Sequence, residues 1–339
     1  MLRFLPDLLP DAELHFAVGP LGVDVLRSLV GDVPTHVVTT RAVPRVAVAL
    51  PSLARRVRAD VIFTQYQIAL SRIPSAVLIH DISAEDPHAA AWLSRRRRLR
   101  YRATYRSGAR FASRLLTVSD YTKQQMVQLY GLDPATVDVA PNAVDPALAT
   151  LLAVPRERRP GVVLAAGNVL PRKNLVTLAR GVRMLVDDGM DVRLRVVGQV
   201  PPEGLQDRSA MEDALGDRVG FTGYVTMEQL AEEYTSADVF ACPSLYEGFG
   251  IPVLEAMAAG TPVLVSDRTS LPEVAGDAAL VVPGEDPGAW AQALRQALTD
   301  EGCRRKLVEA GARRQRDYDW RSSAAVVAGS LRTAAASRG

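Results

Sequence analysis

The chain contains little cysteine and carries almost no net charge. Only two of its 339 residues are cysteines, Cys242 and Cys303, and they lie far apart without metal-ligand spacing. This usage favours a compartment that keeps thiols reduced. The formal net charge of +2 gives no general reason to expect a nucleic-acid partner.

Long apolar runs are also missing. No run reaches the roughly 18 residues that a membrane-spanning helix needs. Residues 1–10 lack the charged-then-apolar layout of a signal peptide. We therefore expect a cytoplasmic protein that is still able to touch a membrane surface.

What the chain does contain is a repeated alternation of short apolar runs and helical periodicity. Its length predicts two domains of roughly 150 residues each. Short apolar runs between helices indicate parallel strands that are covered on both faces. The predicted strands are Leu14–Val18, His36–Thr39, Val61–Thr64, Ala76–Ile79, Leu115–Val118, Val137–Ala140, Val162–Ala166, Leu194–Val197, Val219–Thr222, Val239–Cys242, Val263–Val265 and Ala279–Val282. The pattern predicts an α/β protein with a doubly wound, Rossmann-like architecture that occurs twice.

A charged segment bounded by prolines divides the two halves. Residues 154–160 read Val-Pro-Arg-Glu-Arg-Arg-Pro and are the predicted linker, which places the domains at 1–154 and 155–339. In the second domain, Asn174 is a good N-cap for an amphipathic helix that Gly189 would end in a left-handed conformation.

The strongest local signal is a glycine loop between a strand and a helix. Residues 246–250 read Tyr-Glu-Gly-Phe-Gly and follow the strand that ends near Cys242, while Pro252 suits the first turn of a helix. The glycines let the backbone approach a ligand, and a helix N-terminus offers free N–H groups to an anion. Glu247 would lie in the loop and Glu255 about one turn into the helix, where both can face the crevice at the carboxyl ends of the strands.

Spacing alone does not establish a function for these residues. Glycine loops before helices are common, and any helix N-terminus favours nearby carboxylates. The loop has no phosphate-binding lysine and is not a P-loop. An arginine–lysine pair such as Arg172 and Lys173 is usually solvated surface, and a lone His80 at a strand end is more often structural. Tyr246 and Phe249 can equally well simply pack.

Several separated motifs resemble the retaining GT-B glycosyltransferases of family 4. The segment from Tyr246 to Glu255 resembles the two-glutamate motif of that family, with seven residues between the glutamates. Residues 167–175, Gly-Asn-Val-Leu-Pro-Arg-Lys-Asn-Leu, resemble its diphosphate-binding turn. Further matches, in the expected order, are His80-Asp81, Ser119 and residues 141–145, 260–266 and 271–279. The branch resembled is the mannosyl- and rhamnosyltransferases of surface-polysaccharide synthesis.

The resemblance implies a GT-B fold, with two Rossmann-like domains facing across a cleft and a last helix, at roughly 322–335, that crosses back to the first domain. It implies transfer of a mannose-, rhamnose- or glucose-type hexose from a nucleotide-diphosphate sugar to a glycan, lipid-linked or small-molecule hydroxyl. The anomeric configuration would be retained without a metal or other cofactor. Retention is generally explained by same-face attack assisted by the leaving phosphate, so no protein nucleophile is assigned.

The resemblance also assigns roles to particular residues. Glu247 and His80 would act at the donor sugar as the catalytic residues. Arg172 and Lys173 would neutralise the diphosphate leaving group, and Glu255 would accept hydrogen bonds from the ribose hydroxyls. The other expected donor-binding residues are Gly167, Gly198, Gly248, Phe249, Gly250 and Ile251.

Two features depart from the family pattern. The family usually opens with a strand and a glycine-rich loop, whereas residues 1–10 resemble the end of the first helix, so that strand and loop are expected to be missing from the domain at 1–154. Either the chain start is set too late, or the protein lacks part of its acceptor site. Asn168 stands where many members carry arginine, which weakens the phosphate site modestly. The missing loop leaves a non-catalytic nucleotide-sugar-binding subunit that needs a partner as one alternative. The shared fold leaves a nucleotide-sugar epimerase as another.

The most basic stretch of the chain runs from Ser94 to Arg106. One interpretation is a solvated helix face. The other is peripheral contact of Arg95–Arg106 with anionic lipid headgroups or a phosphorylated acceptor. The carboxylates of Asp317 and Asp319 are expected to form a turn and a helix cap rather than a metal site.

Overall fold

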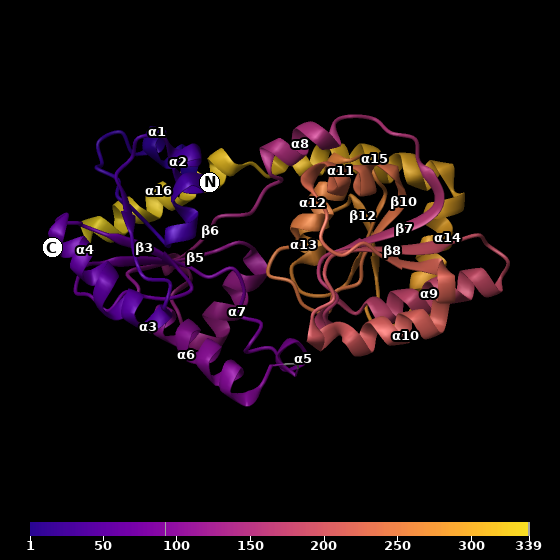
Figure 1. Cartoon of the computed structure of the whole chain (residues 1–339), viewed down its shortest axis with the longest axis horizontal. Coiled ribbons are helices and arrows are strands. Elements are labelled where there is room, and N and C mark those ends of the chain that lie inside the picture. The colour runs from indigo at the N-terminus through magenta and orange to yellow at the C-terminus, as the bar shows by residue number, and fades with distance from the viewer. Residues whose placement is uncertain (92, 338–339) are drawn as a thin grey trace. The chain divides into compact units, whose positions relative to one another are not determined.

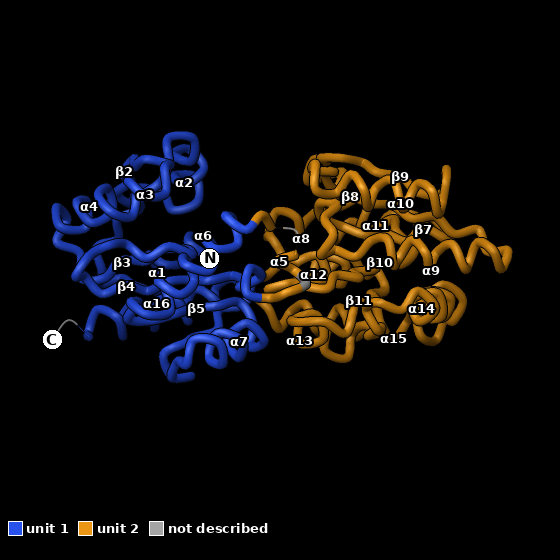
Figure 2. Tube along the Cα trace, turned by 90° about the horizontal axis from the view of Figure 1, so that it is seen from below, with its two compact units in different colours: residues 1–85, 95–142, 319–339 blue, residues 86–94, 143–318 orange. Residues whose placement is uncertain are grey.

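The computed structural model describes residues 1–91 and 93–337, and the chain folds into two compact units (Figures 1 and 2). Unit 1 comprises Met1–Glu85, Arg95–Asn142 and Asp319–Gly339, and unit 2 comprises Asp86–Ser94 and Ala143–Tyr318.

The change from one unit to the other falls before the predicted linker. Helix α8 (Pro146–Leu152) already belongs to unit 2, where it packs on α11 and α12, because Leu148 and Leu152 bury their side chains there. The last two residues of the predicted linker, Arg159 and Pro160, are the first residues of strand β7. The linker prediction over 154–160 is therefore wrong at its C-terminal end.

Unit 2 is built on one parallel six-stranded sheet with the order β12-β11-β10-β7-β8-β9. The strands are β7 (Arg159–Ala166), β8 (Arg193–Val197), β9 (Val219–Phe221), β10 (Ala237–Cys242), β11 (Val263–Ser266) and β12 (Ala279–Val282). This is the doubly wound order in which the chain builds outward from β7 to β9, returns to the centre, and builds outward again from β10 to β12. The six strands predicted for this half of the chain are confirmed.

Helices flank the strands of unit 2. Besides α8 they are α5 (Pro87–Ala90), α9 (Leu175–Asp187), α10 (Leu205–Leu215), α11 (Met227–Ser236), α12 (Ile251–Ala258), α13 (Leu271–Ala275), α14 (Pro287–Thr299) and α15 (Glu301–Arg314). Helix α9 buries Leu178, Val182 and Leu185 completely, because these residues recur on one face at helical spacing. They pack in one core cluster with Trp290 of α14.

Asn174 does not cap α9 as predicted. Its backbone is left-handed (φ 53°, ψ 33°), and its side chain makes no capping hydrogen bond. The side-chain Nδ2 instead donates to the carbonyl oxygens of Pro243 at 3.2 Å and Gly284 at 2.7 Å. Asn174 thus ties the start of α9 to the loops that follow β10 and β12. The left-handed glycine after this helix is confirmed, since Gly189 has φ +86°.

Unit 1 contains a parallel four-stranded sheet and a separate parallel pair of strands. The larger sheet has the order β3-β4-β5-β6, with β3 (Ile62–Gln65), β4 (Ser75–Leu78), β5 (Arg114–Thr117) and β6 (Val137–Val139). The pair consists of β1 (Phe16–Val18) and β2 (Thr35–Val37). The six strands predicted for this half are therefore also confirmed, with ends that shift by one or two residues.

The helices of unit 1 are α1 (Leu5–Leu8), α2 (Val23–Val30), α3 (Ala42–Pro44), α4 (Leu50–Arg56), α6 (Arg95–Phe111), α7 (Asp120–Tyr130) and α16 (Trp320–Ala336). The short 3-10 turns of the two units are η1 (Leu2–Phe4), η2 (Pro20–Gly22), η4 (Pro134–Thr136), η5 (Pro171–Lys173), η6 (Pro202–Gly204), η7 (Gly216–Arg218) and η8 (Gln315–Asp317), and η3 (Arg45–Ala49) is a π-helical turn.

The C-terminal helix α16 packs within unit 1, against β4, β5, β6 and α1. Asp319 caps it by accepting hydrogen bonds from the N–H groups of Arg321 and Ser322, as predicted for this turn. On the sheet side, the Ser330 hydroxyl donates to the Asp138 carboxylate, which also accepts two 2.7 Å hydrogen bonds from Arg114. The chain therefore returns to unit 1 after unit 2 is complete.

The carboxyl ends of β7 and β8 approach each other so closely that only glycine fits. Gly198 has φ +145°, and a Cβ there would lie 2.3 Å from the carbonyl oxygen of Gly167. We expect Gly198→Ala to destabilise unit 2 by at least about 2 kcal/mol, through steric overlap and an unfavourable backbone conformation. Calorimetric unfolding measures this effect.

Gly329→Ala in α16 is the control, because a Cβ there meets nothing within 4 Å. Its unfolding temperature should stay the same or rise slightly, since alanine favours the helix interior by up to about 1 kcal/mol. Unchanged unfolding of Gly198→Ala would contradict the close packing of the two strand ends.

Candidate functional site

The two predicted motif loops of unit 2 meet at the point where the strand order reverses. Strands β7 and β10 are neighbours, and the loop 167–174 follows the first while the loop 243–250 follows the second. A backbone hydrogen bond of 2.8 Å, from Leu245 N–H to the carbonyl of Arg172, joins the loops. Doubly wound sheets bind ligands outside the carboxyl ends of the strands at this switch point. The candidate site is therefore where the fold predicts one.

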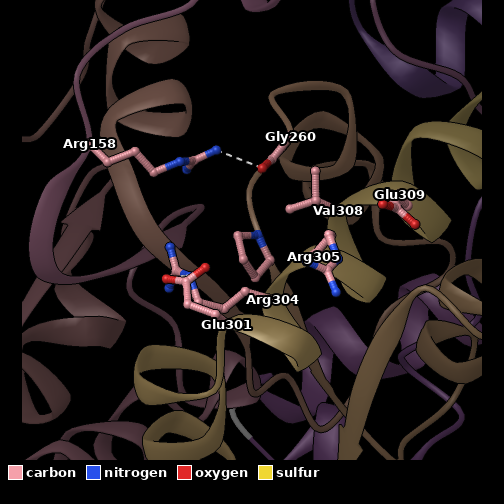
Figure 3. A pocket seen from close by; sticks show the side chains of 8 residues that line it. Arg158, Gly260, Glu301, Arg304, Arg305, Val308 and Glu309 are labelled. Atoms are coloured by element: carbon pink, nitrogen blue, oxygen red, sulfur yellow. Dashed lines mark hydrogen bonds and ion pairs between the residues drawn. The ribbon is translucent and has the colours of Figure 1, made fainter.

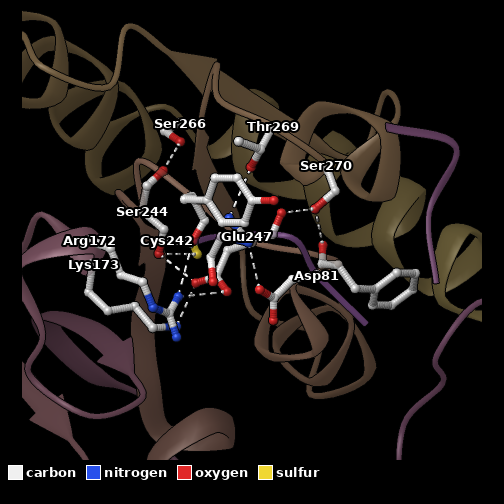
Figure 4. Close-up of polar contacts among 12 residues, drawn as sticks. Asp81, Arg172, Lys173, Cys242, Ser244, Glu247, Ser266, Thr269 and Ser270 are labelled. Carbon is white, nitrogen blue, oxygen red and sulfur yellow. Dashed lines mark hydrogen bonds and ion pairs between the residues drawn. The ribbon is translucent and has the colours of Figure 1, made fainter. Parts of the chain in front are cut away.

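At the centre of the site, Glu247 forms ion pairs with both predicted cations (Figure 4). Lys173 Nζ lies 2.6 Å from Oε1, and the guanidinium of Arg172 lies 3.2 Å from Oε2. The Ser244 hydroxyl donates to Oε1 at 2.8 Å. The Glu247 side chain is only 13% exposed, so these partners replace most of its water. The structure thus brings together three residues that the sequence assigned to one site.

This environment keeps Glu247 ionised. Burial alone would raise the pKa of its carboxyl group, but the charges of Lys173 and Arg172 and the hydrogen bonds from Lys173 and Ser244 lower the pKa below its usual value of 4.5. One carboxylate then faces two cations. The cluster therefore carries one surplus positive charge. It lies at the carboxyl ends of the central strands, a place suited to binding an anion.

The glycine loop is held by hydroxyl groups that sequence reasoning missed. Glu247 N–H donates to Thr269 Oγ1 at 3.0 Å, and the Ser270 hydroxyl donates to the carbonyls of Glu247 and Phe249, each at 3.0 Å. Thr269 and Ser270 follow the neighbouring strand β11. A polar side chain just after a parallel strand was the one signal that could have indicated them.

The loop residues that were predicted to bind the nucleotide-sugar donor differ in how far their side chains are exposed. Gly250 has φ +105° and leads into α12, of which Ile251 is the first residue. The Phe249 side chain is 4% exposed and packs edge-on against Tyr318, with ring centroids 5.4 Å apart. Tyr246 is likewise buried, at 2% exposure. Because the Phe249 ring packs in this way, any contact of Phe249 with a nucleotide sugar would come from its main chain.

Gly167 leaves room for the lysine of the cluster. Its φ is +118°, and a Cβ there would lie 3.1 Å from Lys173 Nζ. The next residue, Asn168, accepts a 3.1 Å hydrogen bond from the N–H of Gln199 through Oδ1. Asn168 therefore closes the turn after β7.

The second glutamate of the motif, Glu255, lies in α12 and has a different environment. Its Oε2 accepts a 2.6 Å hydrogen bond from the hydroxyl of Tyr234 in α11. Burial raises the pKa of the Glu255 carboxyl group, and the charge of Asp145 raises it further, although the Tyr234 hydrogen bond opposes both. The two glutamates of one loop and helix thus have pKa values shifted in opposite directions.

His80 belongs to unit 1, where it follows β4. Its ring lies 5.4 Å from that of Tyr66, and the Tyr66 hydroxyl donates to Asp81 Oδ2 at 3.2 Å. Burial lowers the pKa of His80, against the opposing charge of Asp81. The imidazole is therefore neutral at physiological pH, and able to donate or accept one hydrogen bond at each ring nitrogen according to its tautomer.

A hollow of about 410 Å³ on unit 2 lies away from these loops, beside residues that precede β7 and β11 (Figure 3). Its Arg158 donates to the carbonyls of Gly260 and Ala237 and to the Thr261 hydroxyl. These bonds join three segments at the amino ends of the strands. Arg158 therefore has a structural role, because its hydrogen bonds hold these segments together. The candidate site lies at the other end of the strands, where their carboxyl ends are.

Comparison with known proteins gives the same class of protein as the fold and the site. Residues 153–314 match the family model described as "Glycosyl transferases group 1", and residues 11–148 match the one described as "Glycosyltransferase Family 4". The structure also resembles that of Anabaena HepE in complex with UDP and glucose, with a TM-score of 0.70, 16% identity and coverage of 98% of this chain and 95% of that one. WaaG, a glycosyltransferase involved in lipopolysaccharide biosynthesis, gives a TM-score of 0.68 at 19% identity, over 94% of this chain and 99% of that one. At these identities the likeness shows the fold, two Rossmann-like units of the GT-B class.

Curated relatives are more similar in sequence over shorter stretches. The O-antigen chain mannosyltransferase B of Escherichia coli is 32% identical over an alignment of 228 residues, which covers 62% of this chain and 58% of that protein. The D-inositol 3-phosphate glycosyltransferase of Streptomyces coelicolor is 31% identical over an alignment of 251 residues, which covers 64% of this chain and 54% of that protein. The chain thus spans little more than half the length of the curated relatives it matches. It belongs to the GT-B glycosyltransferases of family 4, as its motifs predicted.

Replacing Glu247 with glutamine should destabilise unit 2 in a pH-dependent way. At pH 7 the change leaves two cations without their shared carboxylate, and breaking a buried pair destabilises by about 3–5 kcal/mol. Because the folded-state pKa is lowered, the wild-type contribution is present above the usual value of 4.5 and is lost as the pH falls further. The stability gap between the two proteins should therefore narrow between pH 7 and about pH 3.

Denaturant unfolding at several pH values measures this gap, with Glu309→Gln on the exposed side of α15 as the control. The control should match the wild type throughout. A gap for Glu247→Gln that stays constant with pH would show that the ion pairs do not hold this carboxylate ionised.

Proposed function

We propose that the protein is a retaining glycosyltransferase that moves a hexose from a nucleotide-diphosphate sugar to a glycan, lipid-linked or small-molecule hydroxyl acceptor. The observation that carries the proposal is the cluster of Glu247, Lys173 and Arg172 at the switch point of unit 2. The names of the relatives support it, since they include mannosyltransferases from Escherichia coli and Mycolicibacterium hassiacum. The solved structure of HepE with UDP and glucose supports a nucleotide-sugar donor.

In this proposal the surplus charge of the cluster stabilises the leaving diphosphate. Lys173 and Arg172 would bind the phosphate oxygens, whose negative charge grows as the bond to the sugar breaks. The N-terminus of α12, which begins at Ile251 after Gly250, would add backbone N–H donors. The protein's own cations then supply the neutralisation that transfer requires, and no metal is given a role.

Glu247 has two tasks in the same proposal. Its carboxylate would hold the two cations in place by offsetting their repulsion, a role that its ion pairs of 2.6 and 3.2 Å with them support. With a donor bound, the phosphates would take over part of that charge, and the carboxylate would accept hydrogen bonds from the sugar hydroxyls. His80 of unit 1 would supply a neutral hydrogen-bonding group to the donor sugar and phosphate.

Removing either charged partner should abolish most of the activity. We expect Lys173→Ala and Glu247→Ala to reduce sugar transfer at least about 100-fold, as the loss of preorganised electrostatic groups typically does. Transfer is measured with UDP, GDP and dTDP sugars in the presence of EDTA against a screen of hydroxyl acceptors.

Lys306→Ala on the exposed face of α15 is the matched control and should transfer at the wild-type rate. Wild-type rates in both site variants would remove the proposed site. Donor binding by the wild type without transfer to any acceptor would instead support the non-catalytic subunit.

We also propose that α6 contacts anionic membrane surfaces. Its outward face carries Arg96, Arg100 and Arg110, together with the side chains of Leu99 and Phe111, which are 58% and 70% exposed. Basic side chains with apolar residues between them suit a headgroup layer. Among the helices of residues 1–91 and 93–337, none is long and apolar enough to cross a bilayer.

Co-sedimentation with anionic and neutral lipid vesicles at low salt tests this contact. The wild type should bind only the anionic vesicles. Arg96→Gln combined with Arg100→Gln should weaken binding roughly tenfold or more, since each basic residue near the surface contributes about 1 kcal/mol. The pair Arg305→Gln and Arg313→Gln on α15 removes the same charge elsewhere and should bind normally. Equal binding by both double variants would contradict a role for α6.

A further inference from the structure

Tyr234 is a buried residue whose hydroxyl points at the second glutamate of the motif. It lies near the end of α11, has no exposed surface, and packs its ring against Phe240 with centroids 5.6 Å apart. Its hydroxyl donates to Glu255 Oε2 at 2.6 Å. A short hydrogen bond to a carboxylate in a poorly solvated place is among the stronger hydrogen bonds of proteins.

This bond occupies only one of the two oxygens of Glu255. Within the part of the chain that the structure describes, no protein hydrogen bond to Oε1 is found, and the residue is half-buried rather than enclosed. Because the Tyr234 hydroxyl holds Oε2, rotation of the Glu255 carboxyl group is restricted, and Oε1 keeps one orientation. A carboxylate held in this way can accept hydrogen bonds from a ligand without first being reorganised.

We propose that Tyr234 is a positioning residue that directs the unoccupied oxygen of Glu255 towards the ribose hydroxyls of the nucleotide donor. The inference rests on the proposed function and on the ribose-binding role that the family resemblance implies for Glu255. It goes further because it assigns ribose recognition to two residues, Glu255, which would contact the ribose, and Tyr234, which would not. Tyr234 lies outside the two-glutamate motif, which runs from Tyr246 to Glu255.

The Tyr234 hydroxyl also favours the ionised form of the Glu255 carboxyl group, which is the form that ribose recognition needs. The groups that face Glu255 are Tyr234 from α11 and Asp145 at the start of α8. Burial and the negative charge of Asp145 raise the pKa of Glu255, and the Tyr234 hydrogen bond lowers it. Burial and Glu255 together raise the pKa of Tyr234 well above its usual range, so its hydroxyl stays protonated and remains a donor.

The pKa shifts of Glu255 determine how ribose recognition should depend on pH. A carboxylate accepts hydrogen bonds from ribose hydroxyls better than the neutral acid does, so ribose recognition should be lost as the pH falls through the pKa of Glu255. Without the Tyr234 hydroxyl that pKa should rise further. The loss of recognition should then begin at a higher pH.

Tyr234→Phe isolates this role because it removes a single oxygen atom. The ring contact with Phe240 is kept, as is the 2.7 Å hydrogen bond from Thr261 to the Tyr234 carbonyl. Tyr224→Phe is the matched control, since Tyr224 lies in the same unit and is 83% exposed.

The experiment measures calorimetric binding of UDP or GDP, whichever the wild type binds better, between about pH 5 and pH 8. It compares this with binding of an analogue of the same nucleotide that lacks the ribose hydroxyls. The wild type and Tyr224→Phe should prefer the hydroxylated sugar about tenfold or more, as expected for hydrogen bonds to a charged group. Tyr234→Phe should lose most of that preference and show the acid-side loss at higher pH, with binding of the analogue unchanged. A residue needed only for packing would weaken both ligands equally and leave the pH profile in place.

Glu255→Gln gives a second, independent measurement. It should remove the preference and its pH dependence together, and adding Tyr234→Phe to it should change neither further. The positioning role would be overturned if Tyr234→Phe kept the wild-type preference for the hydroxylated nucleotide and its pH profile. It would also be overturned if the effects of Tyr234→Phe and Glu255→Gln added up in the double variant. Neither result would contradict donor binding. Failure of the wild type to bind any nucleoside diphosphate would instead overturn the proposed function, and this inference with it.

Discussion

The interaction on which the site depends is the pairing of Glu247 with Lys173 and Arg172. These residues come from two loops about 75 positions apart in the sequence, and their ion pairs of 2.6 and 3.2 Å join those loops at the switch point of the sheet. A buried carboxylate without partners would be neutral, and two unpaired cations would repel each other. Because each charge is kept in place by the others, the cluster is preorganised and still has one positive charge to offer a ligand.

The loop and helix that carry Glu247 also carry Glu255, and the surroundings give the two carboxyl groups different properties. Two cations lower the pKa of Glu247, whereas burial and Asp145 raise the pKa of Glu255. Groups of one chemical type whose pKa values are pushed apart are suited to different tasks. In the function we propose, the Glu247 carboxylate would lie at the reacting end of the donor, and the Glu255 carboxylate, positioned by the Tyr234 hydroxyl, would lie at the nucleoside end.

Much of the fold could be predicted from the sequence, because parallel strands covered on both faces must be continuous apolar runs, and all twelve expected strands are present. The ends of elements were less predictable. Arg159 and Pro160 look like linker residues but pair in β7, and Asn174 has the side chain of an N-cap but uses it to tie loops together. The cluster around Glu247 could be expected only through the family resemblance, since no local pattern connects residues so far apart. Tyr234 was missed because its hydrogen bond to Glu255 arises from tertiary packing alone, whereas Ser270 had only its position after a parallel strand as a signal.

The central claim is that the surplus charge of the Glu247 cluster binds a nucleoside diphosphate. It is tested most directly by isothermal titration of the wild type and Lys173→Ala with UDP, GDP and dTDP and with the corresponding monophosphates, all in EDTA. The account predicts that one diphosphate binds without metal and more tightly than its monophosphate, and that Lys173→Ala loses this preference for the second phosphate. Equal binding of mono- and diphosphates by the wild type, or an unchanged preference in Lys173→Ala, would contradict it.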